Sequence, residues 1–275
     1  MINILNKSNF VFKDQLNKYE GKVRDVYTLN NNILVMIASD RISAFDVVMP
    51  KGITYKGQIL NQIAVEMLNK TSDIVPNWLI SNPDPNVSIG KKCNPIKVEM
   101  VVRGYLSGHA FREYNSGKRE ICGNKMQNGL KENDKFKFPI ITPTTKADQG
   151  LHDQDINPTE IIKQKLLSKK DYDKIYEISL SLYKRGSEIA NKQGLILVDT
   201  KYEFGYDQNG TITLIDEIHT PDSSRYFYFD SYEELQEKGL KQKQLSKEFF
   251  REWLMLNNFR GLQNQLIPDI NEDVI

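Results

Sequence analysis

Residues 194–225 constrain the fold more than any other stretch, because two β-strand patterns there end on acidic residues. The runs LILVD and TITLID are apolar up to Asp199 and Asp216, as in buried strands that end at a site. Between them, Asp207–Gly210 has the composition of a turn. The pattern predicts an antiparallel hairpin that carries charge into a sheet.

The register of this hairpin decides which charges meet. If Asp207–Gly210 closes the turn, Lys201 faces Asp216 on the partner strand. Since side chains alternate between the two faces of a strand, Asp199 and Glu203 would share the face of Lys201 and Asp216. A slip of one residue would move Asp216 to the opposite face.

Two explanations of such a charged face stay open on pattern alone. A hairpin with one solvated face carries charges freely, and the pattern by itself favours this explanation. Buried carboxylates, in contrast, need internal partners or a cation, and a divalent ion with nucleotide phosphates would satisfy them. The polar segment EIHTPDSSR directly after Asp216 favours a binding site.

Composition narrows the class of protein. With 275 residues the chain can bury a large core in one or two domains. Its formal net charge of +1 argues against a dedicated nucleic-acid-binding protein. Cys93 and Cys122 have neither metal-site spacing nor a disulfide framework, which predicts a reducing, cytoplasmic location. No apolar run approaches the roughly 20 residues of a membrane span, so no membrane contact is expected.

The remaining pattern predicts an α+β fold, with a β-rich N-terminal lobe over 1–95 and an α+β lobe over 96–275 that ends in helices. Strands are expected over 22–29, 33–39 and 95–105, and helices over 57–70, from 157, over 171–193, from 231 and from 246. Asn157, Ser231 and Ser246 are suited to cap three of these helices. Loops are expected over 81–85 and 142–154, an exposed excursion with a small hairpin over 115–138, and a loosely held tail after 261.

Two polar motifs lie outside the hairpin. In YEGKVRDVY, Lys22 and Arg24 lie on one face of a strand and could hold a polyphosphate, although this motif alone favours an exposed strand. In SDRISAFD, the side chains of Asp40, Arg41 and Ser43 could bind a small polar substrate, or they could satisfy one another within a turn.

The chain contains five motifs in an order typical of one enzyme family: YEGKVRDVY, SDRISAFDVVMP, KVEMVVRGYLSG, VDTKYEFG and DEIHTPDSSRY. Over residues 19–226 it resembles the SAICAR synthetase (phosphoribosylaminoimidazole-succinocarboxamide synthase) family. The resemblance implies a ligase of de novo purine (IMP) biosynthesis, which joins L-aspartate to the carboxylate of carboxyaminoimidazole ribonucleotide. ATP is consumed, and SAICAR, ADP and phosphate are formed. It also implies a two-lobed, kinase-like ATP-binding fold that uses Mg²⁺.

The resemblance assigns roles to individual residues. The residues implied in ATP binding are Lys22, Arg24, Glu99, Met100, Val101, Lys146, Glu203 and Asp216, and the last two are also implied Mg²⁺ ligands. The residues implied in substrate binding are Asp40, Arg41, Ser43, Arg103, His109, Asp199, Lys201 and Arg225, with Asp199 and Lys201 as the catalytic pair. The segment 99–101 matches a hinge that contacts adenine through backbone groups. His109 stands where the family often has serine.

The expected chemistry is activation of a carboxylate by ATP. Phosphorylation to an acyl phosphate, followed by attack of the aspartate amine, is preferred over amine-first addition, and Asp199 would orient the amine or accept its proton. His152 with Asp153 would act in acid–base chemistry or positioning, and His219 would order its loop. A kinase-like small-molecule phosphotransferase is the alternative activity, and a non-catalytic nucleotide-binding module is a third interpretation. The partners are small molecules, and a homo-oligomer is compatible with the sequence.

Overall fold

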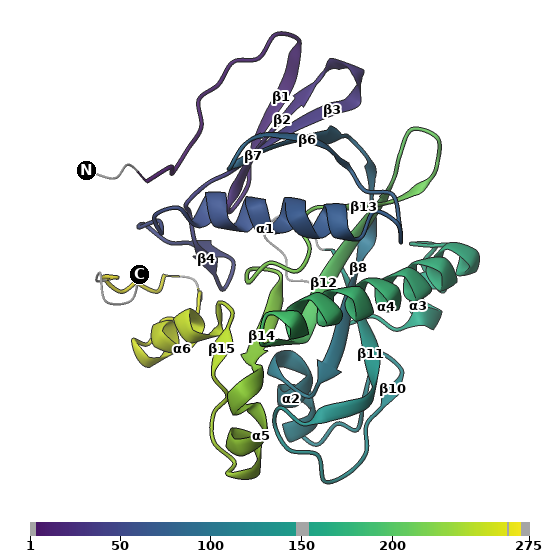
Figure 1. Ribbon diagram of the computed structural model, residues 1–275, viewed down its shortest axis with the longest axis vertical. Coiled ribbons are helices and arrows are strands. Elements are labelled where there is room, and N and C mark those ends of the chain that lie inside the picture. The colour runs from purple at the N-terminus through teal and green to yellow at the C-terminus, as the bar shows by residue number, and fades with distance from the viewer. Residues whose placement is uncertain (1–3, 147–153, 263, 271–275) are drawn as a thin grey trace. The chain divides into compact units, whose positions relative to one another are not determined.

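The computed structural model describes residues 4–146, 154–262 and 264–270 (Figure 1). The chain forms two compact units. The first contains residues up to 66, 78–92 and those from 246 onward, and the second contains 67–77 and 93–245. Both units contain antiparallel strands and helices, so the α+β prediction is confirmed. The division differs from the expected single boundary between residues 95 and 96, because the end of the chain belongs to the first unit.

A five-stranded antiparallel sheet forms the centre of the first unit, in the order β1–β2–β3–β7–β6. Its strands are β1 (Gln15–Glu20), β2 (Arg24–Leu29), β3 (Ile33–Ala38), β7 (Val87–Lys91) and β6 (Leu79–Asp84). A short 3₁₀ turn, Asn30–Asn32, joins β2 to β3, and the two short strands β4 (Ser43–Ala44) and β5 (Val47–Val48) pair with each other. The buried side chains of Tyr27, Val35 and Ile37 cluster in the core of this sheet.

The loop expected over 81–85 is wrong, because most of this segment belongs to the edge strand β6. Asn82, Pro83 and Asp84 have turn chemistry, which misled the sequence pattern. β6 pairs with β7 through two register shifts. Edge strands tolerate proline and irregular pairing, because one side of their backbone needs no ladder partner.

Helix α6 (Glu248–Leu256) packs into the first unit although it lies near the end of the sequence. Its Phe250 and Leu254 join the buried side chains of residues 42–49 in one apolar cluster. Ile270 is buried in the same cluster, so the prediction of a loosely held tail is wrong at this residue. Helix periodicity predicted α6 itself but not the surface on which it packs.

The second unit is built on a sheet in the order β11–β8–β12–β14–β15, with β13 paired to β12. Its strands are β11 (Lys135–Thr145), β8 (Asn94–Tyr105), β12 (Leu195–Tyr206), β14 (Ser224–Tyr228), β15 (Gln244–Leu245) and β13 (Ile212–Ile215). β8 and β12 are neighbours in this sheet, so side chains at matching register positions share a face. Helix α1 (Lys56–Lys70) begins in the first unit and ends in the second.

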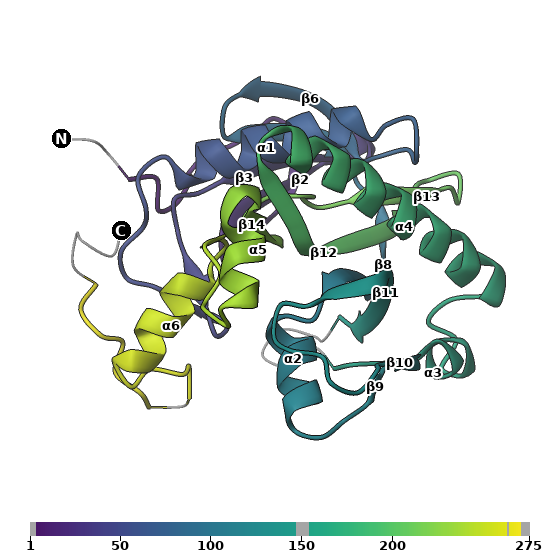
Figure 2. The same ribbon diagram turned by 60° about the horizontal axis from the view of Figure 1, so that its bottom comes forward.

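Helix α4 (Lys169–Lys192) runs across one face of this sheet along β12 (Figures 1 and 2). The Tyr202 hydroxyl on β12 is hydrogen-bonded to His219 Nε2 at 2.6 Å. The His219 ring lies so close to Gly186 of α4 that an added Cβ would be 2.5 Å from it. α4 therefore covers the face of β12 that carries Tyr202. The opposite face, which carries Lys201 and Glu203, is left for the polar groups described below.

Helix caps follow the sequence in one case and depart from it in two. The Asn157 side chain caps α3 by accepting a hydrogen bond from the backbone amide of Glu160. The N-cap of α6 is Lys247, one residue after the expected Ser246, whose hydroxyl still accepts a hydrogen bond from the Glu248 amide. Ser231, the third expected cap, lies inside α5 (Phe229–Glu237), whose N-cap is Tyr228. Its buried hydroxyl has no hydrogen-bond partner among the described residues, so that prediction is wrong.

Smaller elements complete the second unit: α2 (Gly108–Asn115), β9 (Glu120–Ile121), β10 (Asn124–Lys125) and α3 (Pro158–Lys163). The hairpin expected within 115–138 is β9–β10, and its Ile121 joins a small apolar cluster with Ala110 and Tyr114 of α2. The loop expected over 142–154 is wrong at its start, since β11 continues to Thr145; residues 147–153 lie outside the described part. No helix in the described ranges is long and apolar enough to cross a membrane.

Candidate active site

The hairpin predicted from the sequence forms, with a register one residue away from the expected one. β12 and β13 pair Phe204 with Leu214, so Lys201 does not lie opposite Asp216. Asp216 follows the end of β13 and has a left-handed backbone with φ of 62°. This conformation ends the strand alternation, and the charge of Asp216 still acts on Lys201. The expected neighbourhood is therefore reached by a different backbone path.

Strand β8 supplies the other half of the charged face. Glu99 pairs with Glu203 across the β8–β12 ladder, and Arg103 pairs with Asp199. Paired residues on neighbouring strands project to the same side. Their charged side chains therefore form a row along one face of the sheet, with arginines at one end and lysines at the other.

The lysine end of this row consists of Glu99, Lys146, Lys201 and Glu203, called here the carboxylate–lysine cluster. Lys201 Nζ lies 3.0 Å from Glu99 Oε1 and 2.5 Å from Glu203 Oε1. Lys146, which directly follows β11, donates to Glu203 Oε2. Both glutamates are 5% exposed, whereas the Lys146 side chain is 43% exposed and can reach a bound ligand. Glu203 is thus held by two ammonium groups, one on each oxygen.

Electrostatics fix the protonation states in this cluster. Burial favours the neutral form of Glu203, but the charges and hydrogen bonds of Lys201 and Lys146 outweigh it and lower its pKa to about 2. Burial likewise lowers the pKa of Lys201, but Glu203, Glu99 and Asp216 together raise it above its ordinary value. At neutral pH Glu203 is therefore ionised, and Lys201 and Lys146 are charged.

The arginine end of the row consists of Arg103, Asp199 and Arg225, called here the arginine cluster. Arg225 Nη1 donates to Asp199 Oδ2 at 3.0 Å, and Arg103 Nη1 lies 3.6 Å from the same oxygen. Arg225 also donates to the Ser107 hydroxyl at 2.9 Å, and Arg103 Nε donates to the Thr142 hydroxyl at 2.9 Å. Burial lowers the pKa of Arg103, yet a guanidinium stays protonated in proteins. Two buried, oriented cations are suited to bidentate binding of phosphate or carboxylate.

The turn before α2 gives Arg225 its position. Gly108 has a φ of +57°, and a Cβ on it would lie 2.6 Å from Arg225 Nη1. Glycine is therefore required twice, for the left-handed backbone and for the approach of the guanidinium. His109, the next residue, is partly exposed and its Nε2 lies 2.8 Å from Asp155 Oδ2. The hydrogen bond to His109 outweighs burial and lowers the pKa of Asp155.

Three polar residues of this site were not anticipated from the sequence: Ser107, Thr142 and Asp155. Ser107 and Thr142 hold the two arginines, and Asp155 holds His109. The sequence pattern predicted an irregular loop at Thr142. The strand alternation that aligns Thr142 with β8 was therefore not recognised. Ser107 stands in the motif KVEMVVRGYLSG, so its proximity to Arg103 was the one available signal.

The expected adenine hinge does not fit the position of residues 99–101. These residues lie inside β8, which pairs with β11 on one side and β12 on the other. Backbone groups of a strand paired on both sides bond to its neighbours and are not available to a ligand. Met100 is also fully buried. Glu99 takes part through its carboxylate instead, by its contact with Lys201.

In the first unit, Lys22 lies in the turn between β1 and β2. The prediction that it lies inside a strand is therefore wrong. The turn is closed by a hydrogen bond of 2.7 Å from the Gly21 amide to the Arg24 carbonyl. Lys22 forms an ion pair with Asp46, and both side chains are about half exposed (53%). Arg24 begins β2 and is half-buried. The two cations thus flank a glycine-containing turn.

The loop with Asp40 and Arg41 is satisfied internally. The Asp40 carboxylate accepts hydrogen bonds from the backbone amides of Leu5 and Gly57 at 2.9 and 3.0 Å. Arg41 donates to the buried Asp25 carboxylate at 2.8 Å and to the Gly21 carbonyl at 2.9 Å. Arg41 therefore supports the turn that carries Lys22. Ser43 begins β4 and is half-buried.

His219 is buried, with its Nε2 bonded to Tyr202 and its carbonyl accepting from the Tyr226 hydroxyl at 2.6 Å. Burial lowers its pKa to about 3, so the ring is neutral at physiological pH. These contacts agree with the expectation that His219 orders the loop before β14. His152, considered for acid–base chemistry, lies outside the described residues.

A magnesium ion fits this site only together with a ligand that brings further oxygens. Within the described ranges, no group of three or more His, Cys, Asp and Glu side chains is arranged to hold a metal. Glu203 and Asp216 nevertheless supply the hard carboxylate oxygens that Mg²⁺ prefers, and both act on the same lysines. Mg²⁺ is usually held by one or two carboxylates plus substrate phosphates. The two acids match that kind of site.

Comparison with known proteins assigns the chain to a family. A family model described as SAICAR synthetase matches residues 17–266. The chain belongs to the SAICAR synthetase family. A relative from Flavobacterium psychrophilum, named phosphoribosylaminoimidazole-succinocarboxamide synthase, is 59% identical over 274 residues, which cover 100% of this chain and 87% of the relative. A relative of the same name from Bacteroides thetaiotaomicron is 59% identical over 271 residues, covering 98% and 86%.

Solved structures of SAICAR synthetases share the fold. One titled SAICAR synthase is 31% identical with a TM-score of 0.78, covering 96% of this chain and 93% of its own. The Saccharomyces cerevisiae SAICAR synthase complexed with SAICAR is 30% identical with a TM-score of 0.76, covering 94% and 89%. A SAICAR synthetase in complex with ADP is 25% identical with a TM-score of 0.71, covering 92% and 100%. The resemblance seen in the five motifs is therefore confirmed.

Proposed function

We propose that this chain is an ATP-dependent carbon–nitrogen ligase that joins L-aspartate to the carboxylate of carboxyaminoimidazole ribonucleotide, giving SAICAR, ADP and phosphate. Family membership supports this activity, and relatives in solved structures are titled as complexes with SAICAR and with ADP. The reaction is a step of de novo purine biosynthesis.

The observation that carries the proposal is the order of charges along one face of β8 and β12. The arginine cluster around Asp199 lies at one end, and the carboxylate–lysine cluster around Glu203 lies at the other. Glu203 lies four residue steps beyond Asp199 along the strand, which is about 13 Å. A small anionic substrate bound to the arginines can thus present its carboxylate toward the lysines. A ligase of this type needs both anion binding and charge neutralisation at a transferring phosphoryl group.

We propose that the carboxylate–lysine cluster serves the phosphoryl transfer. Lys146 exchanges its contact with Glu203 for an oxygen of the γ-phosphate, and Lys201 stays beside Glu99 and Glu203 as a fixed positive charge. A carboxylate oxygen of the substrate attacks the γ-phosphorus, ADP leaves, and an acyl phosphate is formed. Bound by Glu203 and Asp216 with the phosphates, Mg²⁺ would supply charge neutralisation and alignment.

The arginine cluster serves substrate binding and the second step. Arg103 and Arg225 bind phosphate or carboxylate groups of the substrates by two-point contacts. The aspartate amine, after losing a proton, attacks the acyl carbon and phosphate leaves. The Oδ2 atom of Asp199 already accepts a hydrogen bond from Arg225 and lies near the guanidinium group of Arg103. This geometry supports orientation of the two arginines by Asp199 more than transfer of a proton to it. The general base is therefore assigned no residue.

Several finer assignments stay proposals of the same kind. Lys22 and Arg24 are proposed to contact ATP phosphates. Asp40, Arg41, Ser43 and His109 keep their proposed place at the substrate end, with Arg41 acting through the turn that it supports. A kinase-like two-lobed arrangement, a cytoplasmic location and a homo-oligomeric state also stay predictions.

Dependence on aspartate tests the proposed activity. Purified protein with ATP, Mg²⁺ and carboxyaminoimidazole ribonucleotide is expected to release phosphate at a substantial rate only after L-aspartate is added. D-Aspartate and L-malate serve as matched additions that alter the stereochemistry or remove the amine. Phosphate release that is equally fast without L-aspartate would reject the ligase and favour a small-molecule phosphotransferase.

A further inference from the structure

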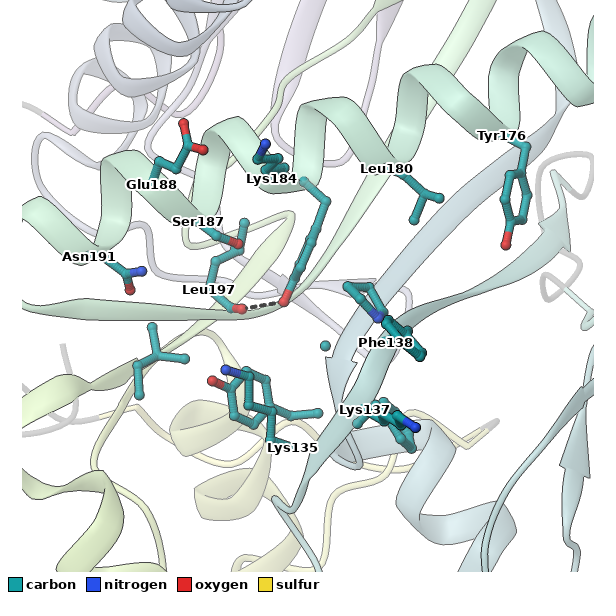
Figure 3. Close-up of a pocket in the computed structure, with 16 residues that line it drawn as sticks. Lys135, Lys137, Phe138, Tyr176, Leu180, Lys184, Ser187, Glu188, Asn191 and Leu197 are labelled. Carbon is teal, nitrogen blue, oxygen red and sulfur yellow. Dashed lines mark hydrogen bonds between the residues drawn. The ribbon is translucent and has the colours of Figure 1, made fainter.

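A cavity lies within the second unit, away from the charged row. It has a volume of about 590 Å³ and lies between α4 and the strands β8, β11 and β12 (Figure 3). Tyr183 of α4 reaches the sheet there and donates a hydrogen bond to the Leu197 carbonyl at 2.6 Å. Gly104 permits this approach, since a Cβ on it would lie 2.1 Å from the Tyr183 hydroxyl. The cavity is therefore on the α4 side of the sheet, and Arg103, adjacent to Gly104, projects to the other side.

An interruption of strand pairing creates the cavity. Lys135 of β11 pairs with Tyr105, but the next pair along the ladder is Ile140 with Arg103. The four residues 136–139 thus lie outside the ladder and bow away from β8. Bulges of this kind are frequent beside functional sites because they redirect side chains. The volume falls within the range of 300–1,000 Å³ that is typical of small-molecule pockets.

The lining of the cavity combines an apolar floor with a cationic rim. Phe138, Tyr176 and Leu180 contribute the apolar part of the lining. Phe138 is 71% exposed. The rim carries the ammonium groups of Lys135, Lys137 and Lys184, against the single carboxylate of Glu188. None of these lysines forms an ion pair with a described residue. Lys137 Nζ instead lies 5.6 Å from the centre of the Phe138 ring.

We propose that this cavity is a second small-molecule site, which binds an aromatic anion. The ring of the ligand lies against the apolar side chains of the lining, and its phosphate, sulfonate or carboxylate group lies in the positive field of Lys135, Lys137 and Lys184, whose side chains are spread around the cavity (Figure 3). Charge complementarity selects an anion, because the rim has an excess of two positive charges. An exposed aromatic ring next to a lysine favours a flat apolar partner, because stacking removes the facing surfaces of the two rings from water.

The test uses 8-anilinonaphthalene-1-sulfonate, a fluorescent aromatic anion, titrated into the protein with saturating ADP and Mg²⁺. The Lys135→Gln/Lys184→Gln variant is expected to bind the probe at least fivefold more weakly than the wild type. The matched control, Lys131→Gln/Lys174→Gln, removes two exposed lysines outside the cavity and is expected to bind like the wild type. Ser187→Trp, which fills the α4 wall, is expected to abolish binding.

The uncharged analogue N-phenyl-1-naphthylamine separates the two parts of the site. It is expected to bind the wild type and the Lys135→Gln/Lys184→Gln variant equally, and to be lost in Ser187→Trp. Equal affinity of the sulfonate for the lysine variant and the control would overturn the proposal. Unchanged binding to Ser187→Trp, or displacement of the sulfonate by ADP, would also overturn it. Aspartate-dependent phosphate release is measured in parallel, so that loss of the ligase fold is seen separately.

Discussion

Replacing Glu203 by glutamine tests the carboxylate–lysine cluster without any substrate. Lys201 and Lys146 bind the two oxygens of Glu203, and glutamine keeps the shape of the side chain while removing its charge. Burial alone would raise the pKa of Glu203, but the two lysines lower it from 4.5 to about 2. Each pKa unit corresponds to about 1.4 kcal/mol, so the ionised carboxylate stabilises the fold by about 3 kcal/mol at pH 7. We expect Glu203→Gln to lose about that amount, because two lysines are left beside an uncharged group.

The pH dependence follows from the sign of this shift. The folded-state pKa of Glu203 lies below its unfolded-state value, so the stabilisation is fully present above pH 4.5 and is lost as the pH falls toward 2. Glutamine does not titrate. The difference in unfolding free energy between wild type and variant should therefore be constant from pH 7 to 5 and fall to about 1.5 kcal/mol at pH 3.

Urea denaturation followed by circular dichroism at pH 7, 5 and 3 measures this difference. Glu237→Gln, a change of an exposed glutamate near the end of α5, is the matched control and should differ from wild type by less than about 0.5 kcal/mol at each pH. A Glu203→Gln difference below about 1 kcal/mol at pH 7, or one that does not change at pH 3, would refute the pairing of Glu203 with both lysines.

Three further predictions concern other parts of the site. Gly108→Ala places a methyl group 2.6 Å from Arg225 Nη1. In steady-state assays the KM for the ribonucleotide should therefore rise about tenfold, which corresponds to about 1.4 kcal/mol, while the KM for ATP stays unchanged. Equal rises in both KM values would contradict the role of Arg225. Asp216→Asn should raise the Mg²⁺ concentration for half-maximal rate at least about tenfold, while the urea midpoint stays near that of the wild type. Wild-type activity of the variant at low Mg²⁺ would show that Asp216 is not a Mg²⁺ ligand. Burial lowers the pKa of His219 from 6.5 to about 3. The stability that the neutral ring supplies is therefore fully present above pH 6.5 and is lost as the pH falls below that value, by up to about 1.4 kcal/mol per pH unit. Between pH 7 and 5 the urea midpoint of His219→Gln should change less steeply with pH than that of the wild type, and an identical slope would contradict a neutral, buried ring.

The charged residues of β12 were predictable because strand alternation is a local property. Asp199, Lys201 and Glu203 share a face with period two, whichever strand pairs beside them. Their partners were less accessible. The pairing of Glu203 with Glu99 joins residues about 100 positions apart, and only the order of the family motifs suggested that these segments belong to one site.

The errors arise where local chemistry does not decide the backbone. The hairpin register was wrong by one residue, because turn composition at 207–210 does not fix which residues close the ladder. The left-handed conformation of Asp216 ends the strand alternation while its charge still acts on the lysines, and it has no signature in the sequence. The hinge expected at 99–101 failed because a strand paired on both sides looks the same in sequence as one with a free edge.

Transfer of oxygen from the substrate to phosphate tests the central claim most directly. Carboxyaminoimidazole ribonucleotide labelled with ¹⁸O in its carboxylate is incubated with the protein, ATP, Mg²⁺ and L-aspartate, and the released phosphate is analysed by mass spectrometry. If the γ-phosphoryl group of ATP activates that carboxylate, each phosphate carries one ¹⁸O atom and one SAICAR is formed with it. Unlabelled phosphate, released at the same rate, would contradict the account.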